Sequence, residues 1–225
     1  MPAPEILRVA RDEGADVIVM SSHGLSGLTK RFFGSTTERV LRATAIPVLV
    51  TPKDGERVVS LSEMCRHIGR VVAPVDLTPA SPHQVKVAAG VATALSAPML
   101  LVHVLEPVFI PPSVRLAIPG SGAERRADAE GRLLALATSS ATSATTEALV
   151  VSGDPSEEIV KLAETRDAGL IVEGLYSSGL LGPRMGSVTY RVLCLTHALV
   201  LALPPVPAAS GAPADEATLA LCTGA

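Results

Sequence analysis

The sequence is nearly free of aromatic side chains: its 225 residues include no tryptophan, two tyrosines and three phenylalanines. Proteins that bind single-stranded nucleic acids usually stack the bases on aromatic rings, and a surplus of positive charge draws proteins to the phosphate backbone. Here the formal net charge is -3. Binding to DNA or RNA is therefore disfavoured on both grounds.

Cysteines and long apolar runs are also scarce. Cys65, Cys194 and Cys222 show no paired spacing, which argues against a disulfide framework or a zinc site. No stretch reaches the ~18 uninterrupted apolar residues needed to cross a bilayer, and the N-terminal residues do not resemble a secretory signal. We therefore expect a soluble, cytoplasmic protein with no metal and no membrane partner.

What the sequence does contain is a repeat. Residues 34–52 and 186–204 are identical at ten of nineteen positions, at an offset of 152 residues. Upstream, residues 5–19 match residues 158–172 at an offset of 153. The later copy has therefore lost one residue from the loop between the matched stretches. We interpret the two stretches as copies of one unit.

Strand and helix patterns alternate through the later copy. Short apolar stretches at 70–76, 98–107, 146–152, 169–173 and 197–203 predict five strands, with helical patterns between them. This alternation is typical of an α/β fold with a doubly wound parallel sheet.

Two of the predicted helices have recognisable first turns. Thr78 and Pro79 suit the cap and first position of a helix over 78–97. Asp154 and Glu157 have the spacing of a capping box at the start of a later helix. These signals fix where we expect the chain to pass from loop to helix.

The first copy holds only the last two strands and two helices of the unit. Residues 1–52 are too few to bury a stable core alone, so we expect this N-terminally truncated domain to dock on the second unit or on another chain. We predict a linker over 53–69, a complete domain over 70–204 and a disordered tail over 205–225.

The passage from strand to helix in each copy is rich in small residues. Such a loop turns backbone N–H groups toward an anion, and the positive end of the helix dipole adds attraction. Ligands of open α/β sheets bind beyond the carboxyl ends of the strands. These loops therefore suit a phosphate group.

The stretch VIVMSSHGLSGLTKRFFGSTTERVLRATAIPVLV resembles the closing segment of universal stress protein domains. Nucleotide-binding members of that family carry a glycine, two residues, a second glycine, nine residues, and then Gly-Ser or Gly-Thr. The first copy has Ser21, Gly24, Gly34 and Ser35 at these positions, followed by Thr36. One glycine has been lost, so this loop is a degenerate version of the family pattern.

The second copy departs from the same pattern in a different way. It has Gly174, Ser177, Gly186 and Ser187 at these positions, followed by Val188, with eight residues where the family has nine. The resemblance implies that these residues contact the phosphates of an adenine nucleotide.

The resemblance also implies an adenine side to the site. Asp76 matches an acidic residue that contacts the nucleoside at the end of the first strand, with Pro74 nearby. Val104 matches a position that lines the adenine pocket. The first copy has no such strands, so only residues 69–204 can complete a site.

For the fold, the resemblance implies a five-stranded sheet of the adenine-nucleotide-alpha-hydrolase-like type, with strand order 3-2-1-4-5. The resemblance also implies pairing through the last strands, as is common in dimers of the family. We therefore predict that residues 46–51 and 198–203 lie side by side, either within one chain as a pseudo-dimer or between two chains of a homodimer. Either arrangement covers an apolar sheet edge.

Several candidate site residues also have ordinary structural explanations. Ser35 and Glu38 have capping-box spacing, so Ser35 can cap a helix with or without a phosphate contact. Gly24 can be a turn residue, and Asp76 an ordinary loop aspartate. Glu173 beside the second loop would repel a phosphate, which argues against tight ATP binding.

The sequence does not nominate a nucleophile, a general base or a set of metal ligands. We therefore expect no enzyme, with weak ATP hydrolysis left open, and a stress-response sensor or scaffold whose second domain weakly binds ATP or AMP. The alternative is a ligand-free universal stress protein that acts only by dimerisation and partner contact.

Overall fold

The computed structural model describes residues 1–22, 34–52, 68–107, 122–140, 144–178, 182–184 and 186–205. Its strands are β1 (Ile18–Ser21), β2 (Val48–Thr51), β3 (Val71–Pro74), β4 (Met99–Leu105), β5 (Thr146–Ser152), β6 (Leu170–Gly174), β7 (Tyr176–Ser178), β8 (Gly182–Arg184) and β9 (Leu199–Leu203). Its helices are α1 (Pro2–Asp12), α2 (Ser35–Ala43), α4 (Ser81–Ala94), α5 (Gly122–Ser139), α6 (Pro155–Thr165) and α7 (Ser187–Leu195).

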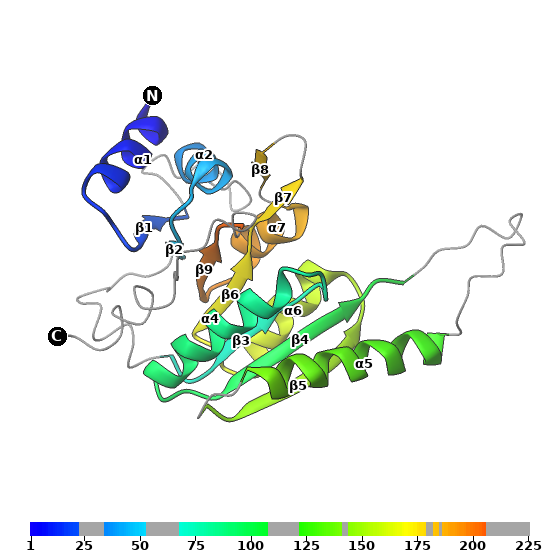
Figure 1. Ribbon diagram of the computed structural model, residues 1–225. Coiled ribbons are helices and arrows are strands. Elements are labelled where there is room, and N and C mark those ends of the chain that lie inside the picture. Colours follow the sequence, from blue (N-terminus) through cyan, green and yellow to red (C-terminus); the bar gives the residue numbers. More distant parts are fainter. Residues whose placement is uncertain are drawn as a thin grey trace, which may run out of the picture.

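Seven of the strands form one sheet in the order β1-β2-β9-β6-β3-β4-β5 (Figure 1). Counted along the later copy alone, β5-β4-β3-β6-β9 is the predicted order 3-2-1-4-5, and these strands are mutually parallel. The predicted doubly wound α/β fold is confirmed. The sheet is larger than the predicted five strands because β2 and β1 continue it beyond β9.

The predicted contact between the last strands of the two copies is present within the chain. β2 pairs with β9 in antiparallel orientation, and Leu49 stands opposite Leu201. β9 is hydrogen-bonded to β6 on its other side, and β2 to β1. Both edges of both strands are therefore covered inside one chain, as buried β-strands require.

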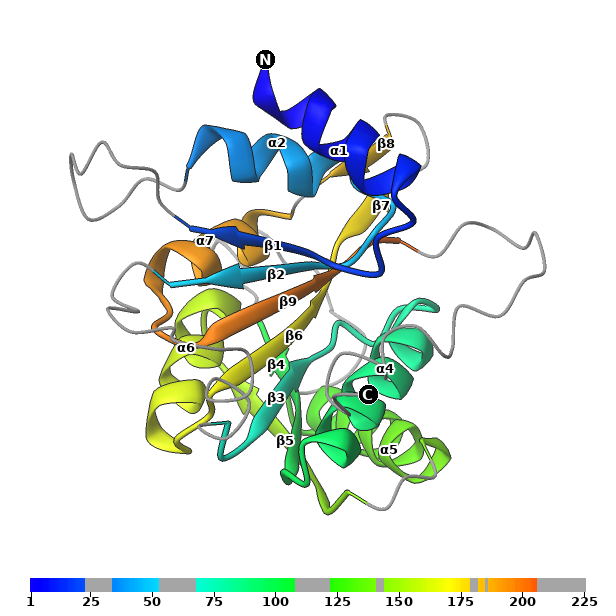
Figure 2. The same ribbon diagram turned by 90° about the vertical axis from the view of Figure 1, so that its left-hand side faces the viewer.

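This antiparallel contact reverses the direction of the first region. β1 runs parallel to β2, so both run opposite to β9, β6 and β3 (Figure 2). The carboxyl ends of β1 and β2 consequently lie at one end of the sheet, measured along the strands, and those of β3, β4 and β6 at the opposite end.

Helices cover both faces of the sheet and produce two apolar clusters. One cluster joins residues of α1, α2, α6 and α7, including Val40, Leu41, Ile159 and Leu193. The other lies under α4 and α5 and includes Leu133. The two β-faces are filled by Val, Leu, Ile and Ala, as buried parallel strands require.

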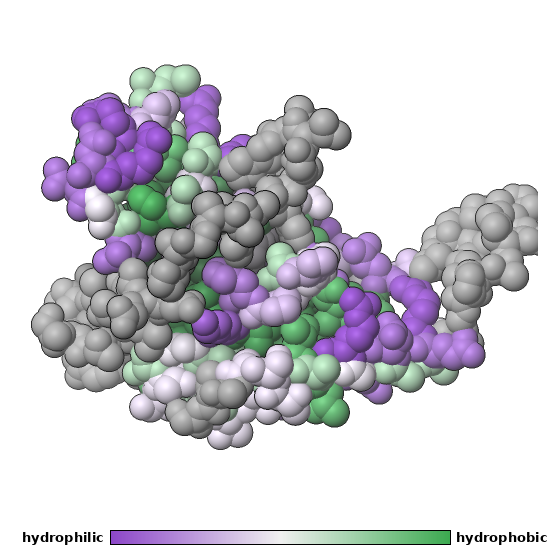
Figure 3. Space-filling view, viewed as in Figure 1, coloured by the Kyte–Doolittle hydropathy of each residue, from purple (hydrophilic) through white to green (hydrophobic). Residues whose placement is uncertain are grey.

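The outer surface of α1 is strongly polar. Hydrophilic residues gather over this helix at the upper left of Figure 3, where Arg8 forms ion pairs with Glu5 and Asp12. The opposite stripe of the helix buries Ala3 and Ala10. This division is the amphipathic pattern of a helix packed against a sheet.

Helix α4 begins later than predicted. Its first residue is Ser81 and the residue before it, Ala80, provides no side-chain cap. Thr78 is not a helix cap, because its N–H and hydroxyl donate to Asp76 in the preceding turn. Pro82 rather than Pro79 occupies the first turn of the helix, where a missing N–H is tolerated.

The start of α2 also differs from the prediction. Gly34 is the N-cap, no side chain caps the helix, and Ser35 is its first helical residue. Glu38 pairs with Arg42 at 2.8 Å, one turn further on, instead of reaching back to the cap. The predicted Ser35 cap is therefore wrong, because the chain enters the helix one residue earlier.

Helix α6 begins as predicted at its cap. The Asp154 side chain accepts a hydrogen bond from the Glu157 N–H at 3.1 Å, with Pro155 at the first helical position. Glu157 does not complete a capping box, since its carboxylate pairs with Arg191 at 3.2 Å. The hydrogen bond from Ser156 is the largest cause that lowers the pKa of Asp154 to about 2, with contributions from the Glu157 N–H and from Arg191.

The short antiparallel pair of β7 and β8 was not predicted, because its residues read as a loop. β8 contacts α2 and so links the two copies. Most of the predicted linker over 53–69 and nearly all of the predicted tail over 205–225 lie outside the described residues. In the part of the chain that the structure describes, no helix combines the length and apolar character needed to span a membrane.

Candidate functional site

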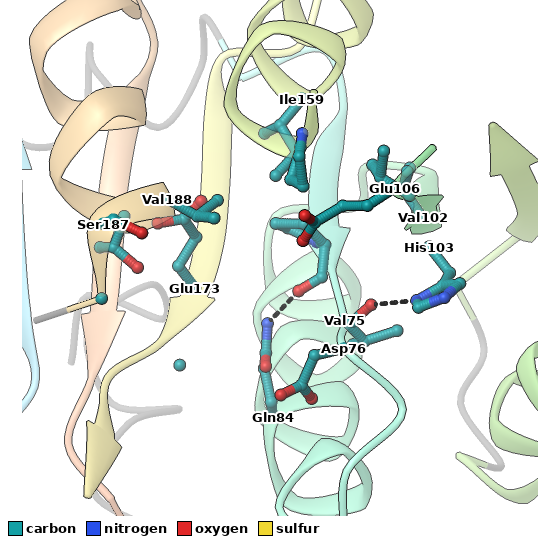
Figure 4. A pocket seen from close by; sticks show the side chains of 16 residues that line it. Val75, Asp76, Gln84, Val102, His103, Glu106, Ile159, Glu173, Ser187 and Val188 are labelled. Atoms are coloured by element: carbon teal, nitrogen blue, oxygen red, sulfur yellow. Dashed lines mark hydrogen bonds between the residues drawn. The ribbon is translucent and has the colours of Figure 1, made fainter. Parts of the chain in front are cut away.

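A cavity of about 450 Å³ opens at the carboxyl ends of β3, β4 and β6 (Figure 4). The N-terminal turns of α6 and α7 form its other walls. It brings together most of the second-copy residues that the sequence nominated: Pro74, Asp76, Val104, Gly174, Gly186, Ser187 and Val188.

The place of the cavity follows from the topology. β3 and β6 are neighbours in the sheet, but the chain leaves β3 toward β4 on one side and leaves β6 toward β9 on the other. The connections diverge at this point, and diverging connections leave a crevice beyond the strand ends. The cavity therefore lies at the switch point of the sheet.

Gln84 on α4 holds the two strands together at this point. Its side-chain Nε2 donates to the Pro74 carbonyl at 2.6 Å and to the Val172 carbonyl at 3.0 Å. Because both amide hydrogens are used, the side chain ties the end of β3 to β6. Its Oε1 lies beside Gly174, where an added Cβ would approach it to 3.0 Å.

Asp76 organises the turn that follows β3. Its Oδ1 accepts hydrogen bonds from the Thr78 N–H at 3.0 Å, the Thr78 hydroxyl at 2.8 Å and the Ser81 hydroxyl at 3.0 Å. Thr78 is thus a partner of this carboxylate and not the helix cap that the sequence predicted. Asp76 still lines the cavity, so a structural role and a place in the site coincide.

β4 contributes a histidine and a carboxylate. His103 Nδ1 lies 2.8 Å from the Val75 carbonyl, and because a carbonyl only accepts, this nitrogen must carry the hydrogen. The other ring nitrogen of neutral His103 is then an acceptor. Glu106 follows the strand and is exposed, and both residues line the cavity opposite Ser187 and Glu173 in Figure 4.

The N-terminus of α7 closes the opposite side. Gly186 is the N-cap, no side chain caps the helix, and its first turn carries no acidic residue. The first N–H groups of a helix have no partner within the helix, and they carry the positive end of its dipole. Ser187, Val188 and Thr189 of this turn all line the cavity.

Glu173 at the end of β6 is the most unusual group in the cavity wall. Its side chain is 3% exposed, and neither carboxyl oxygen has a hydrogen-bond partner in the described part of the chain. Burial raises the pKa of Glu173 to about 7, although the nearby Thr189 hydroxyl opposes the shift in part without forming a hydrogen bond of normal geometry. Near neutral pH the group is therefore divided between its neutral and charged forms.

The ionisable groups of the described lining include carboxyl groups but no lysine or arginine. Asp76, Glu106 and Glu173 supply these carboxyl groups. The described residues also contain no cluster of three or more histidine, cysteine or acidic residues suited to a metal ion.

The nominated residues of the first copy are not part of this cavity. They lie where β1 passes into α2, at the opposite end of the sheet along the strands: Ser21, Gly34, Ser35 and Thr36. Gly24 lies outside the described residues. β1 and β6, the strands that lead into these two passages, therefore end at opposite ends of the sheet. Ser177 of the second copy belongs to β7.

Nine cavity residues were not nominated as binding residues from the sequence: Val75, Gln84, Val102, His103, Glu106, Pro155, Ile159, Glu173 and Thr189. Gln84 could have been found, because it is a polar residue on the helix face that buries Val85, Ala88 and Ala92. An amide at such a position needs internal partners. Glu106 follows a strand end as Asp76 does, but nothing in its local sequence marks it.

Comparison with known proteins agrees with the fold. The sequence model of the Universal stress protein family matches residues 1–52 and 67–204. The chain belongs to the universal stress protein family. Both matched stretches contain the strand-to-helix loops from which the resemblance was first inferred.

Curated universal stress proteins match over a shorter stretch. Universal stress protein MJ0577 of Methanocaldococcus jannaschii is 43% identical over 53 residues, which is 24% of this chain and 33% of that protein. Universal stress protein YxiE of Bacillus subtilis is 41% identical over 49 residues, which is 22% of this chain and 33% of that protein. The matched stretch is thus about a third of each relative.

Among solved structures, a universal stress protein from Archaeoglobus fulgidus has a TM-score of 0.64 at 20% identity, covering 90% of this chain and 66% of its own. A putative universal stress protein from Pseudomonas aeruginosa has a TM-score of 0.65 at 18% identity, covering 96% of this chain and 69% of its own. These likenesses show a shared fold.

Proposed function

We propose that this universal stress protein binds an adenine nucleotide in the cavity of residues 70–204 and works as a stress-response sensor or scaffold in the cytoplasm. The observation that carries the proposal is the convergence of Asp76, Val104 and the N-terminus of α7 on one cavity at the switch point of the sheet. The cavity of about 450 Å³ falls in the usual size range of small-molecule sites.

The two ends of the cavity suit the two ends of such a ligand. The α7 turn offers N–H groups and a positive dipole to a phosphate. On the other side, Val102 and Val104 offer an apolar wall to a base, and Asp76 together with the acceptor nitrogen of His103 offers acceptors to hydroxyl groups. This division follows the family resemblance noted from the sequence.

We propose no enzymatic activity. Catalysis of phosphoryl transfer needs a positioned nucleophile and cationic or metal groups on the transferring phosphate. The described lining offers carboxyl groups and no cation. Phosphate release above background from ATP would overturn this part of the proposal.

We also propose that residues 1–52 are the closing part of a first family unit that forms an intrachain pseudo-dimer with residues 70–204. The β2–β9 register supports this. Val48 pairs with Ala202 and Val50 with Val200, and at the repeat offset of 152 residues Val48 corresponds to Val200 and Val50 to Ala202. Equivalent positions thus contact each other reciprocally, which is the mark of a two-fold interface.

Ser187 and Ser35 provide a matched test of the binding site. Both serines are exposed first residues of equivalent helices, but only Ser187 lines the cavity. We expect Ser187→Trp to weaken AMP binding at least about tenfold in isothermal titration calorimetry, a loss of about 1.4 kcal/mol. Ser35→Trp should bind as the wild type does.

The alternative function is a ligand-free protein that acts through partner contacts alone. The carboxyl-rich cavity wall is the observation that favours it, because anions are poorly accommodated there. If neither AMP nor ATP gives a binding isotherm with wild-type protein at any pH from about 6 to about 8, this alternative replaces the proposal.

A further inference from the structure

We propose that Glu173 is a specificity-determining residue of the cavity: it makes the site prefer an adenine nucleoside or its monophosphate over the triphosphate, and it admits phosphate-rich ligands only by taking up a proton. This inference rests on the proposed nucleotide site and specifies which ligands that site accepts. It is carried by the position, burial and missing partners of one side chain.

The first step concerns position. Glu173 stands at the carboxyl end of β6 and lies beside Ser187 and Val188 at the start of α7 (Figure 4). That helix N-terminus is the part of the cavity suited to an anion. A phosphate placed there therefore shares a confined space with the Glu173 carboxyl group.

The second step concerns the missing partners. Both oxygens of Glu173 are buried without a hydrogen bond to the described residues. Buried polar groups are almost always satisfied, and each exception asks for a reason. A protonated carboxyl group is both a donor and an acceptor, so a ligand oxygen at this point would satisfy Glu173. The orphaned carboxyl is thus explained by a ligand that completes its hydrogen bonding.

The third step concerns charge. A carboxylate next to a phosphate is a like-charge pair in a confined site, and such pairs favour protonation of one member. Burial already raises the pKa of Glu173 to about 7, so the proton that a phosphate-bearing ligand requires is available at small cost near neutral pH. A charged Glu173 repels each added phosphate charge. A nucleoside has no phosphate charge, so its affinity does not depend on this repulsion.

Among the described residues around Glu173, no cationic side chain offsets this repulsion. Asp76 faces the cavity from the end of β3, and His103 and Glu106 face it from β4, while α4 presents the amide of Gln84. The lining residues of α6 and α7 are uncharged, and Ala202 stands opposite Glu173 on β9. Arg191 of α7 is paired with Asp154 and Glu157.

The repeat supplies a natural reference residue. At the offset of 153 residues, Glu173 corresponds to Met20 of the first copy. Methionine has a similar length and no titratable group. Glu173→Met therefore removes the carboxyl while keeping a side chain that the same strand position already carries elsewhere in this chain.

The test is isothermal titration calorimetry of adenosine, AMP and ATP at about pH 6 and about pH 8, with wild-type protein, Glu173→Gln and Glu173→Met. For wild type we expect ATP to bind about tenfold more tightly at the lower pH, as a required proton on a group of pKa about 7 predicts. Adenosine should change less than about twofold. At about pH 8 the order of affinity should be adenosine and AMP ahead of ATP.

Glu173→Gln separates Glu173 from other titrating groups. His103 and the ligand phosphates are the same in both proteins, so their contribution to any pH dependence is common. We expect the variant to bind ATP about tenfold more tightly than wild type at about pH 8. Its ATP affinity should lack the pH dependence that Glu173 contributes in the wild type. The ATP affinity of Glu173→Met should lack this pH dependence as well. The circular dichroism spectrum of this variant checks that it folds.

Two results would overturn the inference while leaving the nucleotide site in place: ATP binding wild type as tightly as AMP at about pH 8, or an unchanged ATP affinity in Glu173→Gln. Absence of binding by every ligand to wild type and to both variants would instead remove the proposed function, and the inference with it.

Discussion

The two strand-to-helix passages of this chain begin with similar sequences and end in different surroundings. β1 leads into α2 and β6 leads into α7, and each helix starts at a glycine N-cap followed by serine, with no side-chain cap. Each also ends at a threonine whose hydroxyl accepts an N–H two residues on, from Ile46 after Thr44 and from Ala198 after Thr196. The two helices therefore begin and end in nearly the same way.

Their neighbours are not the same. Beyond β6 the sheet continues with β3 and then β4, which bring Asp76 and His103 to the cavity that the α7 turn lines. β1 has only β2 beside it among the described strands, and it lies at the sheet edge. The comparison teaches that the glycine-serine turn forms only one wall of the cavity, and that the strands facing this wall are needed as well.

The comparison can be tested most strongly in the core, with Leu201 on β9 and Leu49 on β2. These equivalent leucines stand opposite each other, but Leu201 is 4% exposed under the α4–α5 layer whereas Leu49 is only half-buried. We expect Leu201→Ala to lower the free energy of unfolding by about 2–5 kcal/mol. Leu49→Ala should lower it by about 1–2 kcal/mol, since less apolar surface is lost.

Chemical denaturation of the two variants measures this difference. Equal losses would contradict the account, because they would mean that the first region packs as tightly as the second. A larger loss for Leu49→Ala would reverse the comparison.

The next largest effect is the dependence of stability on pH. Glu173 has a pKa raised from its ordinary 4.5 to about 7. The folded state therefore holds more protons than the unfolded state between these values, and stability falls as pH rises through that window. The full difference amounts to about 3 kcal/mol, present below pH 4.5 and lost by pH values well above 7.

Urea denaturation of wild type and Glu173→Gln at several pH values isolates this contribution. The wild type should lose stability relative to the variant as pH rises from about 5 to about 8. Parallel curves for the two proteins would show that Glu173 has the same pKa in both states, against the observed burial. Met20, at the equivalent position of the first region, has no such dependence to contribute.

A smaller effect is expected at Gly174, whose equivalent in the first copy is the exposed Ser21. A Cβ at position 174 would lie 3.0 Å from Gln84 Oε1, and Gln84 is held by two hydrogen bonds. We expect Gly174→Ser to lower the free energy of unfolding by about 1–3 kcal/mol through this overpacking. Thermal unfolding measures it.

Ser21→Gly is the matched control, and its cost should stay within about 1 kcal/mol, as for a glycine placed in a strand. An unchanged stability of Gly174→Ser would mean that Gln84 moves without cost, and the strand tie it forms would then be weak.

Much of the fold could be predicted from the sequence because the apolar stretches are short and regularly interrupted. The strand observed over Thr146–Ser152 has the predicted bounds, and the predicted contact between 46–51 and 198–203 is present in the β2–β9 pair. The repeat made this contact predictable, since two equivalent last strands each leave an apolar edge to cover.

Helix starts were harder to predict because several residues compete for one role. Thr78 had the chemistry of a cap, yet it donates to Asp76 in the preceding turn. Ser35 had the chemistry of a cap, yet the backbone conformation puts Gly34 in that place. A cap depends on where the backbone turns, and residue type alone does not fix this position.

For the candidate site, the sequence grouped residues that the structure places at opposite ends of the sheet, measured along the strands. The antiparallel β2–β9 contact separates Ser35 from Ser187, and no local pattern encodes the direction in which two copies meet. Gln84 was missed for a related reason: its two acceptors, Pro74 and Val172, come from strands far apart in the sequence. Long-range hydrogen bonds leave only a weak signal, a polar residue on an apolar helix face.

The most direct test of the account is to add AMP to ¹⁵N-labelled protein at about pH 6 and to follow the amide signals of both glycine-serine turns by NMR. The account predicts that the signals of residues 187–189 shift with the ligand while those of residues 35–37 stay in place. Shifts of equal size in both turns, or in neither, would contradict it.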